Sequence, residues 1–130
     1  MINKEDANIL IVDDIEDNRY TLERRLKRDG YKNIFLAEGG KKALDMAVEN
    51  KFDLILLDLM MPDMSGLEVL KHLKGDPLQR SIPVIMVTAS DEVETAAECI
   101  INGADDFITK PFNGTCLLYT SPSPRDLRRS

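Results

Sequence analysis

Residues 54–58, Leu-Ile-Leu-Leu-Asp, limit most strongly what this chain can fold into. Four consecutive aliphatic side chains suit a β-strand that is buried on both faces, as in a parallel sheet. The run ends on a carboxylate, and Pro62 and Gly66 then mark a loop. Asp58 is therefore predicted at the carboxyl end of a strand, where ligands bind in open α/β sheets. Taken alone, Asp58 fits a loop-capping residue equally well.

Three other predicted strands also end on polar side chains. Asp13 and Asp14 follow residues 8–12, Thr88 follows residues 83–87, and Lys110 follows residues 106–109. Because the carboxyl ends of parallel strands meet at one edge of a sheet, we expect these groups to lie together with Asp58. The sequence therefore predicts a site with three carboxylates, a hydroxyl and an ammonium.

The charges of this predicted site indicate its chemistry. Each pair of carboxylates at contact distance repels by roughly 1 to 4 kcal/mol, so the cluster favours a bound cation. Oxygen ligands in small number favour Mg²⁺, which usually bridges to phosphate. The Lys110 ammonium and the Thr88 hydroxyl can both donate to phosphoryl oxygens. A carboxylate in these surroundings is suited to act as a nucleophile toward a phosphoryl group.

Together these motifs resemble the receiver domain of two-component response regulators. The resemblance covers residues 9–113 and rests on Asp13-Asp14, Asp58 with Met60-Met61-Pro62-Asp63-Met64-Ser65-Gly66, Thr88-Ala89 and Lys110-Pro111-Phe112. It implies an α/β fold of the flavodoxin-like, doubly wound type, with five parallel strands in the order 2-1-3-4-5.

The resemblance also implies roles for these residues. Asp58 is the expected phosphoacceptor. Mg²⁺ is expected to bind Asp14, Asp58 and the backbone carbonyl of Met60, with Asp13 acting mostly through a metal-bound water. Three residues are expected to contact the phosphoryl group, namely Thr88, Ala89 and Lys110.

Phe107 occupies the position of the family's switch aromatic, which turns inward when Thr88 moves toward the phosphoryl group. Phe107 has no hydroxyl, so only the packing part of such a switch is available to it. A plain core aromatic is the alternative for this residue. Met60 and Ser90 lie two residues after Asp58 and Thr88, and we expect both to tune the lifetime of the phosphoryl group.

The expected function is phosphorelay signalling by a phosphoacceptor switch that catalyses only its own phosphotransfer and dephosphorylation. The expected partners are a sensor histidine kinase or a histidine phosphotransfer protein, an unidentified output domain or protein that reads residues 91–102 and Phe107, and a second copy in a phosphorylation-dependent dimer. A basic helix face is either a docking surface for the kinase or an ordinary solvated face. That face consists of Arg19, Arg24, Arg25, Lys27 and Arg28.

Apolar stripes at helical spacing predict helices between the strands, over residues 16–29, 40–50 and 91–102, with another opened by a capping box of Ser65 and Glu68. A more polar strand over residues 31–37 is expected at the sheet edge. The residues expected to face inward from the helices are Thr21, Leu22, Leu26, Ala43, Leu44, Ala47, Val48, Leu67, Leu70, Leu73, Val93, Ala96, Ala97, Ile100 and Ile101.

Residues 114–130 do not continue this pattern. Pro122 and Pro124 exclude a helix interior where a receiver has its fifth helix. Residues 116–126 resemble one reading frame of the transposase adapter used in tagmentation sequencing libraries. We therefore expect an incomplete receiver over residues 1–113, followed by a non-native or disordered tail, and we expect lower stability than in a complete receiver.

Other function classes fit the sequence less well. A haloacid-dehalogenase phosphatase needs a second acid two residues after its nucleophile, where Met60 stands. A flavodoxin-like electron carrier needs a phosphate-binding loop after the first strand, where Asp13 and Asp14 would repel a phosphate. The net charge of −6 argues against direct nucleic-acid binding. No apolar run reaches the roughly 20 residues of a membrane span, and no signal-peptide core is present, so we expect a cytoplasmic protein.

Overall fold

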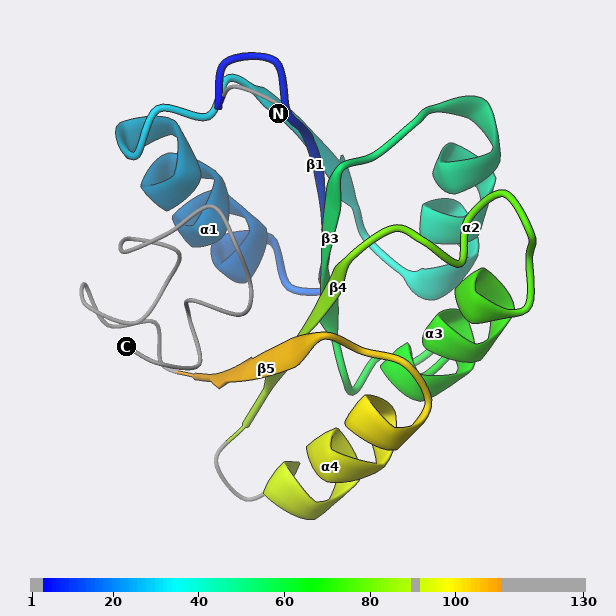
Figure 1. The fold of residues 1–130 in the computed structure, drawn as a ribbon. Helices are drawn as coiled ribbons and strands as arrows, with labels where there is room; N and C mark the ends of the chain where they lie inside the picture. The colour runs from blue at the N-terminus through cyan, green and yellow to red at the C-terminus, as the bar shows by residue number, and fades with distance from the viewer. Residues whose placement is uncertain (1–3, 90–91, 111–130) are drawn as a thin grey trace.

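A computed structural model describes residues 4–89 and 92–110 of the chain. The described part contains five strands that alternate with four helices (Figure 1). The elements are β1 (Asn8–Val12), α1 (Glu16–Arg28), β2 (Asn33–Ala37), α2 (Gly40–Glu49), β3 (Leu54–Asp58), α3 (Gly66–Lys74), β4 (Val84–Thr88), α4 (Val93–Ile101) and β5 (Asp106–Thr109).

The five strands form one parallel sheet in the order β2-β1-β3-β4-β5. This is the flavodoxin-like order, so the predicted fold class is confirmed. In Figure 1, α1 lies on one face of the sheet, while α2, α3 and α4 lie on the other. The predictions for residues 114–130 and for Ser90 lie outside the described residues.

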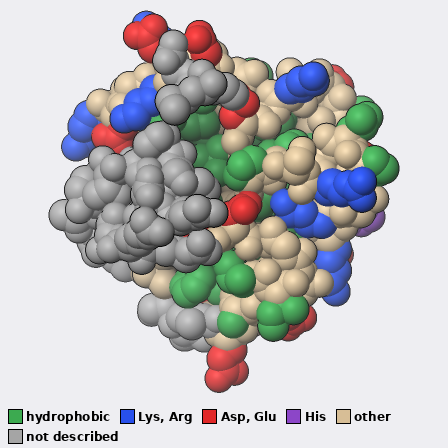
Figure 2. All heavy atoms as spheres, viewed as in Figure 1, with side chains coloured by type: hydrophobic (Ala, Val, Ile, Leu, Met, Phe, Trp, Pro, Cys, Tyr) green, Lys and Arg blue, Asp and Glu red, His purple; other side chains and the backbone are tan. Residues whose placement is uncertain are grey.

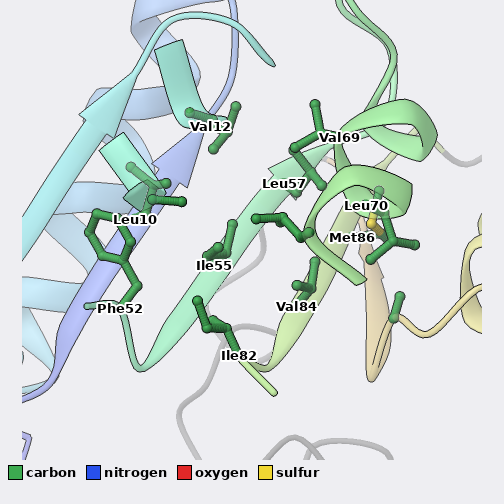
Figure 3. Close-up of a cluster of buried hydrophobic side chains, with 14 of the residues drawn as sticks. Leu10, Val12, Phe52, Ile55, Leu57, Val69, Leu70, Ile82, Val84 and Met86 are labelled. Atoms are coloured by element: carbon green, nitrogen blue, oxygen red, sulfur yellow. The ribbon is translucent and has the colours of Figure 1, made fainter. Parts of the chain in front are cut away.

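The sheet buries alternate side chains of the same strands on its two faces. Leu10, Ile55 and Val84 lie on the face with α2 and α3, where they pack with Val69 and Leu70 (Figure 3). On the α1 face the corresponding core consists of Ile9, Ile11, Leu22, Leu26, Tyr31, Leu56, Ile85 and Val87. Burial on both faces explains why β1, β3 and β4 are continuous apolar runs.

Two aspartates fix the register of the strands at the opposite edge from the predicted site. The Asp53 carboxylate accepts from the backbone N–H of Asn8 at 2.8 Å, and the Asp53 N–H donates to the Asn8 carbonyl at 2.7 Å. Asp105 makes the same pair of contacts with Val84, both at 2.8 Å. These contacts tie the start of β1 to the residue before β3 and the start of β4 to the residue before β5.

Several side chains that were expected to face inward are exposed instead. Thr21 and Ala97 are exposed, Val48 is 77% exposed and Ile101 is 85% exposed. Each stands directly beside a residue that does point inward, and successive helical residues are rotated by about 100°, so both cannot face the sheet. Figure 2 shows exposed hydrophobic side chains around β5 and α4. The Val93 side chain lies outside the described part of the structure.

The edge strand starts later than predicted. β2 begins at Asn33, because Tyr31 still belongs to the turn that ends α1 and donates its N–H to the Leu26 carbonyl at 3.0 Å. Gly30 makes this turn with a φ of +105°, which L side chains rarely adopt. None of the helices in the described residues is long and apolar enough to cross a bilayer.

Candidate functional site

The strand register brings the predicted site residues to one edge of the sheet. Val12 pairs with Leu57, Asp58 with Val87, and Thr88 with Thr109. The strands β1, β3, β4 and β5 therefore end nearly level with one another. Asp13, Asp14, Asp58, Thr88 and Lys110 all lie at this carboxyl edge, as the sequence predicted.

Three carboxylates form the acidic part of the site. Asp13, Asp14 and Asp58 each place one oxygen so that the three atoms lie within 4.8 Å of one another. Asp13 and Asp58 are only 1% and 4% exposed, whereas Asp14 is exposed. Two of the three charges are thus held away from water, where their mutual repulsion is poorly screened.

Asp13 is held in place by the start of α1. Its Oδ1 accepts from the N–H of Ile15 at 2.9 Å and from the Asn18 amide at 3.4 Å, while Arg19 donates to its backbone carbonyl at 2.6 Å. Its second oxygen, Oδ2, is buried and lies 3.5 Å from the Lys110 ammonium. Asp13 therefore presents a fixed, buried carboxylate oxygen to the site.

Lys110 supplies the positive charge from the end of β5. Its Nζ lies 3.2 Å from Asp58 Oδ1 and 3.5 Å from Asp13 Oδ2. Burial by itself would lower the pKa of the ammonium, but the carboxylates of Asp58 and Asp13 outweigh it and raise that pKa. Lys110 therefore remains charged in the site.

One ammonium does not neutralise three carboxylates. Burial and the Asp13 carboxylate raise the pKa of Asp58 from 3.8 to about 6, although Lys110 acts in the opposite direction. The surplus negative charge and the three carboxylate oxygens that lie within 4.8 Å of one another fit a hard cation with oxygen ligands. The carboxylates of Asp13, Asp14 and Asp58 could hold such an ion.

The loop after β3 is packed closely against the strand end. A Cβ on Gly66 would meet the Asp58 backbone oxygen and would lie 2.9 Å from Leu59 Cα, so only glycine fits. The Gly66 N–H donates to the Leu59 carbonyl at 2.7 Å. Ser65 then caps α3 by accepting from the Glu68 N–H at 3.2 Å, which confirms the Ser65 part of the predicted capping box.

The loop after β4 presents Thr88 and Ala89 to the same edge. Thr88 is fully buried, and its hydroxyl donates to the Ala89 carbonyl at 3.1 Å. The Ala89 N–H donates to Glu92 Oε1 at 3.1 Å, and the Glu92 N–H donates to the Ala89 carbonyl at 3.0 Å. Both backbone groups of Ala89, the N–H and the carbonyl, are therefore hydrogen-bonded.

Comparison with known proteins identifies this arrangement. The family model of the response regulator receiver domain matches residues 9–120. The chain belongs to this family. It therefore has the sequence pattern of the receiver domains of two-component response regulators, as the motifs at the strand ends indicated.

Two curated relatives and one solved structure illustrate the similarity. The response regulator PleD of Caulobacter vibrioides is 44% identical over 111 residues, which cover 85% of this chain and 24% of PleD. The cell cycle transcriptional regulator CtrA of the same species is 35% identical, over 81% of this chain and 44% of CtrA. The Vibrio cholerae chemotaxis protein CheY4 has a TM-score of 0.80 and 32% identity, covering 95% of this chain and 97% of CheY4. The receiver thus spans less than half the length of these curated relatives.

Two further predicted residues, Met60 and Phe107, lie outside the charged centre of the site. Met60 follows Asp58 in the loop and is 58% exposed. Phe107 pairs with Met86 in the sheet and is half-buried against the core on the α2 and α3 face. Its position fits both a switch residue and a plain core aromatic.

Two carboxylates at the site edge were not singled out by the sequence. Glu92 bonds the Ala89 N–H, and Asp63 accepts from the N–H groups of Gly40 and Lys41 at 3.3 and 3.2 Å, at the start of α2. Glu92 lies three residues after Ala89, a spacing at which a glutamate reaches back to a backbone N–H. That spacing is the only sequence signal for it, whereas the contacts of Asp63 with Gly40 and Lys41 have no local signal because these residues are distant in sequence.

Proposed function

We propose that this receiver accepts a phosphoryl group on Asp58 and acts as a switch in two-component signalling. The observation that supports this most directly is the Asp58 carboxylate, which lies 3.2 Å from Lys110 within a cluster of two further aspartates. A structural ion pair needs one carboxylate for one ammonium. A site that binds a cation and a phosphoryl group together would explain why three carboxylates surround one ammonium.

The proposed transfer is a displacement at phosphorus. An Asp58 carboxylate oxygen attacks the phosphorus atom, forming a new O–P bond, while the bond from phosphorus to the donor breaks. The leaving group keeps the bonding electron pair. It is an imidazole nitrogen when a histidine kinase or a histidine phosphotransfer protein is the donor, and acetate when acetyl phosphate is the donor. Asp58 must be ionised to attack, so no proton leaves it during the step.

We propose Mg²⁺ as the cation of the site. Asp13, Asp14, Asp58 and the backbone carbonyl of Met60 would hold it, with Asp13 acting mainly through a bound water. The ion would neutralise charge that develops on the phosphoryl oxygens. It would also counteract the burial and the Asp13 charge, which together raise the pKa of Asp58.

Lys110, Thr88 and Ala89 are the proposed donors to the phosphoryl oxygens. Lys110 Nζ already lies beside Asp58, whereas the Thr88 hydroxyl bonds the Ala89 carbonyl and would have to turn. That turn would open space for Phe107 to move inward, and α4 with Phe107 would then form the surface that an output domain or partner reads. Dimerisation on phosphorylation is part of the same proposal.

The lifetime of the phosphoryl group is proposed to depend on Met60 and Ser90. The exposed Met60 side chain offers neither an acid nor an amide to orient a hydrolytic water. Replacing Met60 with asparagine or glutamate is therefore expected to change the rate of phosphoryl loss. Unchanged phosphoryl loss in both variants would contradict this part of the proposal.

The test of phosphoryl acceptance is a Phos-tag mobility shift after incubation with acetyl phosphate and Mg²⁺. We expect a shifted band for the wild type and none for Asp58→Asn. Asp45→Asn, which removes an exposed carboxylate on α2, is the matched control and is expected to shift like the wild type. A shift that persists in Asp58→Asn would place the acceptor elsewhere, and chelation of Mg²⁺ is expected to abolish the wild-type shift.

A further inference from the structure

The backbone N–H of Ala89 already has an acceptor within the chain. It donates to Glu92 Oε1 at 3.1 Å, and the Glu92 N–H returns a bond to the Ala89 carbonyl at 3.0 Å. Glu92 is half-buried, so this carboxylate is only partly screened by water. The two residues are thus joined by a reciprocal pair of hydrogen bonds.

Ala89 has only one group that can bind a phosphoryl oxygen. Its side chain is a methyl, so any polar contact to that oxygen must come from the backbone N–H. One N–H makes one good hydrogen bond, and a carboxylate and a phosphoryl oxygen are both strong anionic acceptors. The two acceptors therefore compete for the same proton.

We propose that the Glu92 carboxylate occupies the phosphoryl-binding N–H of Ala89 in the resting protein and must be displaced when Asp58 is phosphorylated. Glu92 is thus a positioning residue that acts through Ala89 and sets how readily the site accepts a phosphoryl group. This inference rests on the proposed phosphoryl acceptance by Asp58. It assigns to Glu92 a regulatory role of its own, namely holding the resting state.

The hydrogen bonds around Ala89 connect this displacement to Thr88. The Ala89 carbonyl accepts both from the Glu92 N–H and from the Thr88 hydroxyl, at 3.0 and 3.1 Å. Glu92 therefore holds the residue that also holds the Thr88 hydroxyl away from Asp58. Loss of the Glu92 carboxylate contact loosens Ala89 and lowers the cost of turning Thr88.

The prediction concerns acceptance and not loss of the phosphoryl group. Once the phosphoryl oxygen has taken the Ala89 N–H, the Glu92 carboxylate is displaced both in the phosphorylated protein and in the transition state for its hydrolysis. Removing that carboxylate therefore stabilises neither relative to the other. The acceptance rate should rise while the hydrolysis rate stays within about twofold.

The experiment compares Glu92→Gln and Glu92→Ala with the wild type in the full chain. Glu94→Gln is the matched control, because Glu94 is an exposed glutamate of the same helix and its replacement makes the same change in net charge. The measurements are the rate of phosphorylation by acetyl phosphate and the affinity for BeF₃⁻, which mimics a phosphoryl group on an aspartate. Both are repeated at low and high ionic strength, to separate the local contact from long-range attraction of the anion.

We expect the phosphorylation rate and the BeF₃⁻ affinity to rise about three- to tenfold in Glu92→Ala and by less in Glu92→Gln. A change of this size corresponds to the loss of one partly exposed hydrogen bond to a charged group. Glu94→Gln should remain close to the wild type at high ionic strength. The Ala89 amide resonance should differ between wild type and Glu92→Gln without BeF₃⁻ and should coincide with BeF₃⁻ bound. A purely structural role of Glu92 would not produce that pattern.

Three outcomes would overturn the inference. One is that both Glu92 variants remain folded but accept the phosphoryl group and BeF₃⁻ like the wild type. Another is an equal gain in Glu94→Gln at high ionic strength. These two outcomes contradict only the role of Glu92, and the proposed function stands as long as the wild type is phosphorylated on Asp58. A wild type that accepts neither acetyl phosphate nor BeF₃⁻ would overturn the proposed function, and this inference with it.

Discussion

The Lys110 ammonium lies 3.2 Å from an Asp58 carboxylate oxygen, although the two residues are 52 positions apart in the sequence. β3 and β5 do not pair with each other, because β4 stands between them. The contact therefore depends on the register of two strand pairs, which places Asp58 beside Val87 and Thr88 beside Thr109. This ion pair is therefore expected to affect both the stability of the fold and the proposed chemistry of Asp58.

Replacing Lys110 with alanine is expected to destabilise the metal-free protein in a pH-dependent way. At pH 8 the change leaves buried carboxylates without a counter-charge, and we expect a loss of about 1 to 3 kcal/mol in the free energy of unfolding, since Lys110 itself is partly exposed. Lys110 lowers the pKa of Asp58, so its removal raises that pKa further, and the loss should shrink as the pH falls toward 6 and that carboxyl becomes neutral. Urea denaturation at several pH values measures it.

The control for this change is Lys27→Ala. Lys27 pairs with Glu23 at 3.2 Å across one turn of α1, but its side chain is 55% exposed. Exposed pairs of this kind contribute about 0.3 to 0.5 kcal/mol, so the variant should lose little stability at any pH. An equal loss for Lys110→Ala at pH 8 and pH 5 would contradict the assigned ion pair.

The raised pKa of Asp58 predicts how stability depends on pH without metal. A carboxyl whose folded-state pKa is raised from 3.8 to about 6 stabilises the folded state fully below pH 3.8, and this contribution is lost as the pH rises through 6. Asp58→Asn removes that dependence. We expect the variant to gain about 1 to 3 kcal/mol relative to the wild type between pH 4 and pH 7.

Urea denaturation in the presence of a chelator tests this, with the wild type and Asp58→Asn compared at each pH so that the titration of other groups cancels. Asp45→Asn, at an exposed position of α2, should show no such relative gain. With Mg²⁺ the wild type should recover stability by mass action, about 1.4 kcal/mol at ten times the dissociation constant, and Asp58→Asn should recover less. A stability difference that does not change with pH would contradict the raised pKa of Asp58.

The strand ends could be predicted from the sequence, but some of their neighbours could not. The runs that end at Asp13, Asp58 and Thr88 are apolar on both faces, and this pattern directly reports a buried parallel strand. Helix faces were predicted less well, because Val48 and Ile101 are as apolar as the residues beside them, and only the packing angle decides which of two neighbours is buried.

Carboxylates that bind backbone N–H groups far away in the sequence were beyond the reach of sequence patterns. Asp63 lies 23 residues from Gly40, and nothing in either local sequence indicates that they meet. The contact depends on how the loop after β3 lies against the start of α2. A side chain that accepts from a distant backbone has no compositional signature, whereas charged clusters such as Asp13 and Asp14 do.

The Asp63 contact predicts a small, pH-dependent stabilisation of α2. Its carboxylate accepts from the N–H groups of Gly40 and Lys41, and these bonds lower the pKa of Asp63. The stabilisation is therefore present above the ordinary pKa of 3.8 and is lost as the pH falls through the lowered folded-state pKa.

We expect Asp63→Asn to cost about 0.5 to 1 kcal/mol at pH 7, the low end for a helix cap, because the side chain is exposed. Asp45→Asn, which removes an exposed carboxylate of α2 itself, is the matched control. Hydrogen exchange of the first N–H groups of α2 should speed up only in Asp63→Asn. Equal exchange in both variants would argue against a cap supplied by Asp63.

The close packing of Gly66 against the backbone at the end of β3 is expected to support the site. A Cβ at this position would meet the Asp58 backbone oxygen and would lie 3.0 Å from Met86 Cε, so Gly66→Ala must shift the loop that begins at Asp58. We expect a loss of about 1 to 3 kcal/mol in stability, together with weaker Mg²⁺ binding, because the shift moves the backbone that carries Asp58 and Met60.

Gly75→Ala separates this effect from the general effect of replacing a glycine. A Cβ on Gly75 would lie 3.2 Å from the Lys71 carbonyl oxygen, and the backbone there is right-handed helical with a φ of −82°, which alanine adopts readily. We expect a change within about 1 kcal/mol and unaltered Mg²⁺ affinity. Titration with Mg²⁺ measures the affinity of both variants, and urea denaturation measures their stability. An unchanged Mg²⁺ affinity in Gly66→Ala would contradict the prediction, because it would show that the site tolerates a shift of its loop.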